Sequence, residues 1–534
     1  MNENNKYIAI TIGPIGDMMG LVRKPAALWG ASYIFSYISR HLCELIVEKQ
    51  VATCENIITP FFVTKDTASE DEKLLVDRTD GVGLFHDHII VRASLSENLE
   101  KMKEIKREVL NDVAKILAPE SFDTPEKLTN YVNQIEKYIM IAICGFEKEG
   151  DSNAIMYCGK QLDSLELPKH FAASEKRHPI LSRLQNSRSE NQNTTVKMIA
   201  GRFGVNMTEW QLTFEEGKER FVRDLPDIAA SSKAPEFKKN KYYCILRADG
   251  DNMGKIISRL GTDEECREFS QICLQYCSDV AKAVKEYGGV TIFAGGDDLF
   301  ALVPCQGLHP DTKETITVLE FTQVISKLFR ENFETYIDAI KDKNEASAED
   351  ERVPLPSLSF GAFICYANFP LYEAIERSAA LLFGVAKYTA HKNCVAVHLQ
   401  KHAGQSEELV ISNQVLEDSS NGFFERFNFL NKNADTQEEL LLSAANKILL
   451  FKKLLKATPN KNIVHIFENI FDDDSHKKYE DFLHKFLPNM YEICCKPDQI
   501  MLYEKDQLLE PAEPAKTLAQ LIRFMKFYVE KGDM

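Results

Sequence analysis

The sequence predicts an α+β protein with two related halves and a helical C-terminal region. In one half, an apolar strand at 242–246 is followed by a helical pattern and by two short apolar runs, at 291–294 and 299–303, that flank a tight turn. The chain opens with a similar order of strand, turn and helix. Helical periodicity dominates after residue 405, in EELLLSAANKILLFKKLL and TLAQLIRFMKFYVEKG, which predicts a helical bundle there.

Length and changes of pattern predict four structural units. A chain of 534 residues is long enough for three or four domains with separate cores. In the first unit, Pro25 follows the basic pair Arg23-Lys24 and is expected to begin or break a helix. In the third unit, the polar segment 341–354 is expected to be an exposed linker before a strand at 358–365. The expected units are a first α+β unit at 1–135, a mixed, loop-rich unit at 136–237, a second α+β unit at 238–404 and a helical unit at 405–534.

Composition and charge limit the functional classes. The 64 Lys and Arg residues and 80 Asp and Glu residues give a net charge of −16, which argues against free-standing, nonspecific nucleic-acid binding as the main activity. One polar and basic segment, 169–197, is a candidate contact for RNA or a partner subunit, with a surface loop as the alternative. No apolar run approaches the roughly 18 residues of a membrane-spanning helix, and the N-terminus lacks the layout of a signal peptide. We therefore expect a cytoplasmic protein without membrane contact.

The most informative motif is Gly295-Gly296-Asp297-Asp298, which lies between the apolar runs of the predicted hairpin. Glycine tolerates the positive φ of a tight turn and lets a ligand approach the backbone. Two adjacent carboxylates repel each other, and a divalent cation relieves that repulsion. Because Gly and Asp are also common in ordinary turns, the motif alone leaves a plain polar turn as the alternative.

A second acidic segment, Asp249-Gly250-Asp251-Asn252, follows the strand at 242–246 and precedes a helical pattern from Met253 to about residue 286. In a unit of strand, helix and hairpin, the end of the first strand lies beside the hairpin tip. Asp249, Asp297 and Asp298 are therefore candidate ligands for two hard cations about 3.5–4 Å apart, the separation used in phosphoryl chemistry. For Asp251 and Asn252, a helix N-cap is the alternative.

Both motifs, in this order and at this spacing, resemble the ferredoxin-like palm domain shared by nucleotide cyclases, GGDEF enzymes and the polymerase-like large subunit of type III CRISPR effector complexes. Three further stretches are similar to that subunit in its III-B branch: ITIGPIGDMMGLVRKPAALWGASYIFSYISRHL near the N-terminus, GVGLFHDHIIVRA, and LSFGAFICYANFPLYEAIERSAALLFGVAK after the hairpin. The resemblance covers residues 6 to about 404, with gaps, and implies two palms of which the second carries the metal ligands.

The resemblance implies a target-RNA-activated nucleotidyltransferase that uses two Mg²⁺ or Mn²⁺ ions and makes cyclic oligoadenylate from ATP. Its expected partners are CRISPR RNA, target RNA and other effector subunits. Asp249 and Asp297 are expected to bridge the metals, with Asp298 as a third ligand or a supporting residue. The candidate nucleotide contacts include the backbone of Gly250, Asp251, Asn252 and Met253 at a helix N-terminus, and the turn glycines Gly295 and Gly296. Lys387 is a candidate phosphate contact, with a solvent-facing lysine as the alternative, and Ser359 and Gly361 are expected to border the base.

The first palm is expected to lack metal ligands, because it has no equivalent of the GGDD motif. It has Gly13-Pro14-Ile15-Gly16-Asp17 where the second palm has Asp249-Gly250-Asp251, and its hairpin region holds Gly81-Val82-Gly83 followed by Phe85-His86-Asp87-His88. Two like domains with one metal set suggest a pseudo-dimer, in which the silent palm holds a second nucleotide opposite the catalytic one. A purely structural first palm is the alternative.

Several functional alternatives stay open. The chain starts at the first palm strand, so we expect the form without an N-terminal HD nuclease domain; His86 and Asp87 are neighbours in a strand-like segment and point to opposite faces. Some relatives of that form join AMP to S-adenosylmethionine, which makes this molecule a possible co-substrate. A GTP-using cyclase, a noncatalytic scaffold subunit and a template-copying polymerase are the other classes, and the acidic charge balance argues against the last.

Overall fold

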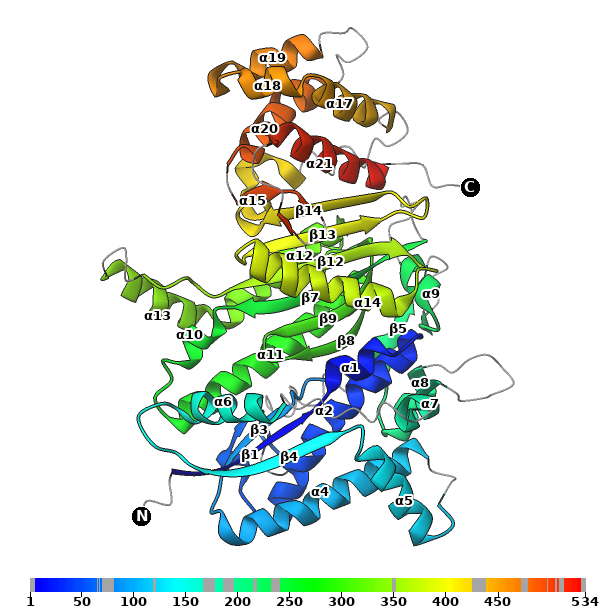
Figure 1. Cartoon of the computed structure of the whole chain (residues 1–534), viewed down its shortest axis with the longest axis vertical. Coiled ribbons are helices and arrows are strands. Elements are labelled where there is room, and N and C mark those ends of the chain that lie inside the picture. The colour runs from blue at the N-terminus through cyan, green and yellow to red at the C-terminus, as the bar shows by residue number, and fades with distance from the viewer. Residues whose placement is uncertain are drawn as a thin grey trace.

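The computed structural model describes residues 5–64, 66, 68–69, 81–118, 122–166, 178–185, 196–214, 219–231, 241–347, 352–424, 438–471, 479–496, 498–504, 507–508 and 513–529. Most of the basic segment 169–197, and residues 348–351 of the expected linker, lie outside these ranges. The chain forms an elongated molecule in which the first palm lies at one end, the second palm in the middle and the C-terminal helices at the other end (Figure 1).

The first palm contains a four-stranded antiparallel sheet in the order β2-β3-β1-β4. One helix, α2, follows β1 and another, α4, follows β3, which gives the βαββαβ order of a ferredoxin-like fold. Pro25 occupies the first turn of α2, so it begins this helix as predicted. The elements are β1 (Lys6–Gly13), α1 (Ile15–Gly20), α2 (Pro25–Glu48), η2 (Cys54–Asn56), β2 (Ile57–Thr59), β3 (His88–Arg92), α4 (Ser96–Leu117), α5 (Pro125–Ile135) and β4 (Met140–Glu147).

The second palm repeats this topology within a seven-stranded sheet of order β15-β14-β13-β12-β7-β9-β8. Its four palm strands, β12-β7-β9-β8, stand in the same order as β4-β1-β3-β2, and β13 is added in parallel beside β12. The elements are β7 (Tyr242–Asp251), α10 (Met253–Ile257), α11 (Asp263–Tyr287), β8 (Val290–Gly295), β9 (Asp298–Pro304), β10 (Gln306–Leu308), β11 (Thr315–Thr317), α12 (Val318–Asn332), α13 (Glu334–Glu345), β12 (Ser357–Tyr366), α14 (Leu371–Ala379), the π-helical η5 (Ala380–Thr389), β13 (Cys394–Gln400), β14 (Ser406–Ser412) and β15 (Ile500–Met501). The two ferredoxin-like palms predicted from the sequence are confirmed.

Several predicted boundaries are wrong. Because β4 pairs with β1 along eight residue pairs, the first palm extends past residue 135, and because β14 pairs with β13, the second sheet extends past residue 404. The helix expected from residue 253 to 286 is split into α10 and α11, since a capping box between Thr262 and Glu265 starts a new helix. Residues 341–345 belong to α13, so the expected linker begins only after that helix.

The remaining elements join the palms and close the far end. The intervening region contains α6 (Ala154–Glu166), α7 (Pro179–Gln185), α8 (Val196–Arg202), η3 (Thr208–Trp210), β5 (Gln211–Thr213), β6 (Glu219–Phe221) and α9 (Leu225–Ala230). The C-terminal region contains α15 (Asn413–Glu417), η6 (Ser419–Asn421), α17 (Glu438–Leu450), α18 (Lys452–Ala457), η8 (Asn460–Asn462), α19 (Ile463–Ile470), η10 (Asp481–Phe486), α20 (Leu487–Cys494), β16 (Tyr503–Glu504), β17 (Gln507–Leu508) and α21 (Pro514–Val529). It is predominantly helical, as predicted. No helix in the described ranges is long and apolar enough to cross a membrane.

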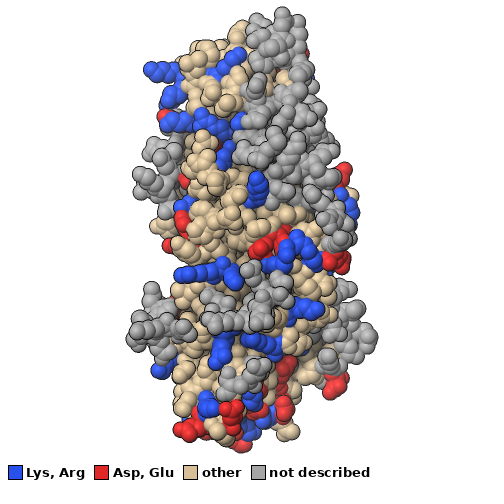
Figure 2. Space-filling view, turned by 90° about the vertical axis from the view of Figure 1, so that its right-hand side faces the viewer, with Lys and Arg blue, Asp and Glu red and all other residues tan. Residues whose placement is uncertain are grey.

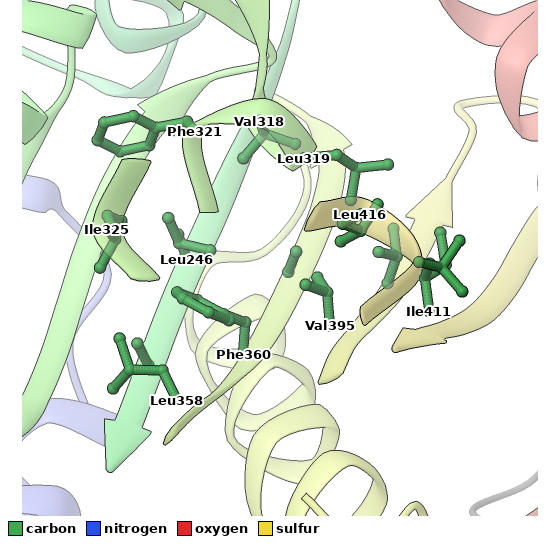
Figure 3. Close-up of a cluster of buried hydrophobic side chains, with 14 of the residues drawn as sticks. Leu246, Val318, Leu319, Phe321, Ile325, Leu358, Phe360, Val395, Ile411 and Leu416 are labelled. Atoms are coloured by element: carbon green, nitrogen blue, oxygen red, sulfur yellow. The ribbon is translucent and has the colours of Figure 1, made fainter. Parts of the chain in front are cut away.

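Strand β7 is buried on both faces and organises the core. Cys244, Leu246 and Ala248 belong to one hydrophobic cluster, whereas Tyr243 and Ile245 belong to a second cluster on the opposite face, as the alternation of a strand requires. In the first cluster, side chains from β7 and β12 lie beneath those of α12 (Figure 3). This packing holds the end of β7 in a fixed place relative to the hairpin of β8 and β9.

The two palms pack against each other reciprocally. Helix α2 of the first palm contacts β8 of the second, and α11, its counterpart in the second palm, contacts β2, the counterpart of β8. Hydrogen bonds add to these contacts. The Arg267 guanidinium on α11 donates to the Ile57 carbonyl on β2 over 2.8 Å, and the Ala294 amide on β8 donates over 3.2 Å to the carbonyl of Gly83, which precedes β3 in the first palm. The palms therefore form an intramolecular pseudo-dimer, as the sequence suggested.

Candidate active site

The GGDD motif forms the tip of the hairpin between β8 and β9. Gly295 pairs with Asp298, which leaves Gly296 and Asp297 as a two-residue loop. Gly296 has a φ of 69°, a conformation that a residue with a Cβ rarely adopts. A loop with positive φ at its first residue matches the twist of the flanking strands. The predicted tight hairpin is confirmed.

The end of β7 lies directly beside this tip. Ala248 pairs with Leu299, so the next residue on each strand places Asp249 beside Asp298. A Cβ added to Gly250 would lie 2.8 Å from Cβ of Asp297 and 2.7 Å from Cγ of Met253, both far inside ordinary contact distance. The absence of a side chain at Gly250 therefore makes room for Asp297. The structure brings the two acidic segments together, as predicted.

The side chain of Lys387, on η5, also reaches the end of β7. Its ammonium forms an ion pair with Asp249, donates a hydrogen bond to the Gly250 carbonyl over 2.7 Å, and lies 3.8 Å from the Asp251 carboxylate. The side chain is only 17% exposed, so the alternative of a solvent-facing lysine is wrong. Lys387 supplies the positive charge nearest to the acidic cluster.

The electrostatics of the hairpin tip favour a cation. Burial and the neighbouring charge of Asp249 raise the pKa of Asp297 to about 7, against the opposing effect of Lys387. Although solvent reaches Asp298, the surrounding protein and then the charges of Asp297 and Asp249 raise its pKa well above the ordinary value. Carboxylates that resist ionisation because they are close together are stabilised when a divalent cation shares them.

The donor set fits Mg²⁺ or Mn²⁺, but its carboxylates are not fully drawn together. Carboxylate oxygens are the ligands that these hard ions prefer. The Asp249 carboxylate is turned toward Lys387. In the described part of the chain, one group of three potential ligands has its donor atoms within 4.8 Å of one another, and that group does not include these carboxylates. The predicted metal ligands Asp249, Asp297 and Asp298 thus lie close together in the fold. That their carboxylates converge on a metal ion stays a prediction.

Asp251 is a structural residue of the site. Its carboxylate is fully buried and accepts hydrogen bonds from the Ser357 and Ser359 hydroxyls, at 2.8 to 3.0 Å, and from the Asn393 amide at 3.0 Å. Burial raises its pKa despite these bonds. Ser357 and Ser359 were missed as partners of Asp251, although their spacing of two places both on one face of a strand. The N-cap alternative for Asp251 is wrong, because its carboxylate binds no amide of α10.

Three other predictions about the nucleotide contacts need correction. The buried hydroxyl of Ser359 is committed to Asp251 and does not border a base. Gly361 packs against η5, where an added Cβ would lie 2.7 Å from the Leu382 amide nitrogen, so this glycine serves helix packing. Gly250 and Asp251 pair with β12 as the last residues of β7, so they do not offer a free helix N-terminus.

Asn252 and Met253 stand where the strand turns into α10. Asn252 has a φ of 61° and no side-chain cap; instead its amide donates to the Leu355 carbonyl over 3.2 Å, and its oxygen accepts from Lys392 over 3.1 Å. The N-cap alternative is therefore wrong for Asn252 too. Met253 is buried against the site, and α10 is only five residues long. A phosphate contact by the backbone of these two residues stays a prediction.

Comparison with known proteins identifies the family. Residues 242–396 match the model of the Cas10/Cmr2 second palm domain, and residues 7–118 match that of the N-terminal region of CRISPR-associated protein Cmr2. The chain belongs to the Cas10/Cmr2 family. The GGDD hairpin and the Asp249 segment both lie inside the matched second palm, which is a nucleotide-cyclase-like domain.

Individual relatives agree with this assignment. Over 215 residues, the chain is 27% identical to the CRISPR system Cmr subunit Cmr2 of Pyrococcus furiosus; the match spans 36% of this chain and only 22% of that relative. The fold is similar to a chain of a type III-B Cmr-beta complex in its apo state, with a TM-score of 0.56 and 12% identity over 98% of this chain and 82% of that chain. It is also similar to a chain of a Csm1–Csm4 cassette in complex with cA4, with a TM-score of 0.52 and 12% identity over 99% of this chain and 70% of that chain.

Proposed function

We propose that this chain is the large subunit of a type III CRISPR RNA-guided effector complex, and that its second palm transfers adenylyl groups from ATP in a metal-dependent reaction. The observation that carries this proposal is the meeting of Asp249, Asp297 and Lys387 at the end of β7 and the tip of the GGDD hairpin. This arrangement lies in the domain that matches the family's second palm.

The residues have distinct roles in the proposed reaction. Two divalent cations, when bound, would activate the attacking 3′-hydroxyl and neutralise the triphosphate and leaving pyrophosphate. Asp249 and Asp297 would hold them, with Asp298 at the rim. Were Asp249 to hold an ion, the Lys387 ammonium would be available to pair with a phosphate oxygen. Asp251 keeps the end of β7 in place through its buried hydrogen bonds.

The reciprocal packing of the palms favours a reaction between two nucleotides. The contact of α2 with β8 mirrors that of α11 with β2, so the two palms meet through equivalent elements. A pseudo-two-fold arrangement places like surfaces opposite each other, which suits a second nucleotide held by the first palm with its hydroxyl facing the α-phosphate on the second.

ATP is the favoured substrate and cyclic oligoadenylate the favoured product. Csm1–Csm4 cassettes that share this fold have been solved in complex with AMPPNP, an ATP analogue, and with cA4. Joining AMP to S-adenosylmethionine at the same site is the second candidate, since the transfer step and its metal ligands are the same.

The proposed partners are CRISPR RNA, target RNA and the other subunits of the complex. On the face shown in Figure 2, the described Lys and Arg side chains form separate groups over the upper and middle parts, whereas Asp and Glu lie mainly toward the lower end. Together with the net charge of −16, this distribution suits RNA contact within an assembly better than RNA binding by the chain alone.

Product analysis of the reconstituted complex tests the proposal. The complex is incubated with Mn²⁺, ATP and matching target RNA, with and without S-adenosylmethionine, with GTP in a parallel arm, and products are resolved by mass spectrometry. We expect adenylate products that depend on target RNA and disappear in Asp297→Asn. Asp338→Asn, which changes an exposed carboxylate on α13, is the control. Products formed from GTP alone would favour a GTP-using cyclase. If no nucleotide gives a product, the chain is better explained as a noncatalytic scaffold subunit.

A further inference from the structure

A second group of potential metal ligands lies in the first palm. Asp87 and His88 stand at the start of β3, and Glu166 is the last residue of α6. One ligand atom from each of the three lies within 4.8 Å of the others, and Nε2 of His88 is 2.9 Å from Oε1 of Glu166. Among the described residues, this is the one group of at least three His, Cys, Asp or Glu side chains that meets this distance.

The strand registers place this group where the second palm has its GGDD carboxylates. In the second palm, β9 begins at Asp298. In the first palm, the equivalent strand β3 begins at His88, which pairs with Thr11 of β1. Counting from these strand starts, Asp87 and His88 occupy the positions of Asp297 and Asp298.

The same comparison explains the third member. Asp249 of β7 lies beside Asp298 of β9. By the pairing of β1 with β3, its counterpart in the first palm is Thr11, which carries no charge, and not a residue of the segment 13–17 that the order of the sequence suggested. The Thr11 hydroxyl donates a hydrogen bond to the Glu166 carboxylate. Glu166, at the end of the helix that follows β4, therefore brings a carboxylate to the place where β1 lacks one.

The charges of the group favour a cation. Burial, and then the nearby charge of Glu166, raise the pKa of Asp87, although His88 opposes this effect. The charge of Asp87 also contributes to the raised pKa of Asp298, so the two acidic groups are within electrostatic reach across the contact between the palms. A cation at one group would relieve repulsion at both.

An ordinary His–carboxylate ion pair is the simpler explanation, and another histidine shows how such a pair differs. His41 has its Nδ1 3.1 Å from Glu44 and its Nε2 3.2 Å from Asp112, so the two carboxylates bind different ring nitrogens and do not converge on one point. The group at His88 does converge. Geometry thus separates a potential metal site from a plain ion pair.

The neighbouring His86 does not take part. Its Nε2 is 2.8 Å from the Thr59 hydroxyl, and its Nδ1 accepts a hydrogen bond from the His88 amide over 3.3 Å. Both ring nitrogens are therefore used.

We propose that the first palm binds one divalent transition-metal ion through Asp87, His88 and Glu166. Two carboxylates balance the charge of the ion, and a neutral imidazole nitrogen beside them favours Mn²⁺ or Zn²⁺ over Mg²⁺. Three protein ligands leave further coordination positions for water or another oxygen ligand. The site is independent of the adenylyl transfer proposed for the second palm.

Metal titration of the full chain tests this site without any assay of activity. In a background carrying Asp249→Asn and Asp297→Asn, Mn²⁺ binding is measured by electron paramagnetic resonance, and thermal unfolding is followed with and without Mn²⁺. We expect one Mn²⁺ per chain and a rise of the melting temperature on its addition. Adding His88→Ala should weaken binding at least about tenfold and remove that rise.

Two further variants complete the test. Glu166→Gln changes a partly exposed helix end and should weaken Mn²⁺ binding even where His88→Ala fails to fold. His41→Ala removes a histidine that also lies between two carboxylates and should leave Mn²⁺ binding unchanged. A background protein that binds no Mn²⁺, or equal binding by the His88→Ala and His41→Ala proteins, would overturn the proposal.

Discussion

Gly250 is the position where a minimal change should disturb the site most. Gly250→Ala adds one methyl group beneath Asp297 without removing any charge or ligand. The new Cβ would lie 2.8 Å from Cβ of Asp297 and closer still to its carboxylate oxygen Oδ2, whereas ordinary contact begins at 3.4 Å. Cβ of Asp297 must therefore retreat by at least about 0.6 Å, and its carboxylate by more. Met253, at 2.7 Å, blocks relief in the other direction. We expect this overpacking to cost about 1–3 kcal/mol of folding stability.

The displacement should matter more for activity than for stability. A misplacement of about 1 Å in a reacting group costs roughly 100-fold in rate, so a shift of this size should lower target-RNA-dependent product formation by about 10- to 100-fold. The rate is measured with the reconstituted complex, ATP and Mn²⁺. Unfolding curves of the chain show whether the protein is still folded at the assay temperature.

A neighbouring glycine provides a matched control. Gly254 belongs to the same segment, on α10, and a Cβ added there meets nothing within 4 Å. Gly254→Ala should keep the normal rate and gain about 0.4–1 kcal/mol of stability. If the two alanine variants form product at rates within about twofold of each other, then the close approach of Asp297 to Gly250 has no part in the reaction.

Four further predictions concern protonation and buried hydrogen bonds in the two palms. A metal binds the ionised carboxylate, and burial raises the pKa of Asp297 to about 7. The Mn²⁺ affinity of the second palm should therefore rise as the pH increases toward 7 and level off above it. An affinity that does not change with pH would contradict this prediction. Lys387→Met removes a charge that lowers this pKa, so the midpoint of the same profile should move to higher pH. Burial lowers the pKa of His86 to about 4, below its ordinary 6.5, so the unfolded chain binds the extra proton and stability should be lost as pH falls from about 6.5 toward 4, by at most about 3 kcal/mol. His86→Gln should flatten that part of the melting-temperature profile, which an unchanged slope would refute. Ser359→Ala should cost about 1–3 kcal/mol in urea unfolding by removing a donor to a buried carboxylate. The same change at Ser347, whose hydroxyl donates an exposed hydrogen bond to the Lys343 carbonyl, should cost less.

The sequence predicted the parts of the site that depend on neighbouring strands. The GGDD turn follows from two apolar runs around a glycine pair, and the nearness of Asp249 follows from the order of strand, helix and hairpin. These inferences succeed because strand pairing and the alternation of side chains are local properties of a hairpin.

The rest of the site depends on contacts between distant segments. The partners of Asp251 lie 106 to 142 residues further along the chain, so its buried carboxylate resembled a helix cap when only its neighbours were considered. Asp87 and Glu166 are also distant in the sequence and come together only in the folded chain. Their approach depends on the direction of helix α6, which the helical pattern of the sequence does not reveal. Strand β4 fell outside the predicted first palm because its pairing with β1 spans more than a hundred residues of intervening chain.

The reciprocal contacts of α2 with β8 and of α11 with β2 have a consequence for how the protein tolerates mutation. In a symmetric homodimer, every substitution appears at both copies of a site, so neither copy changes without the other. Here the equivalent surfaces belong to one chain and are encoded separately. A substitution such as Thr11 in place of a carboxylate alters one palm and leaves Asp249 in the other untouched. The two halves are thus free to diverge at equivalent positions while their packing against each other is kept.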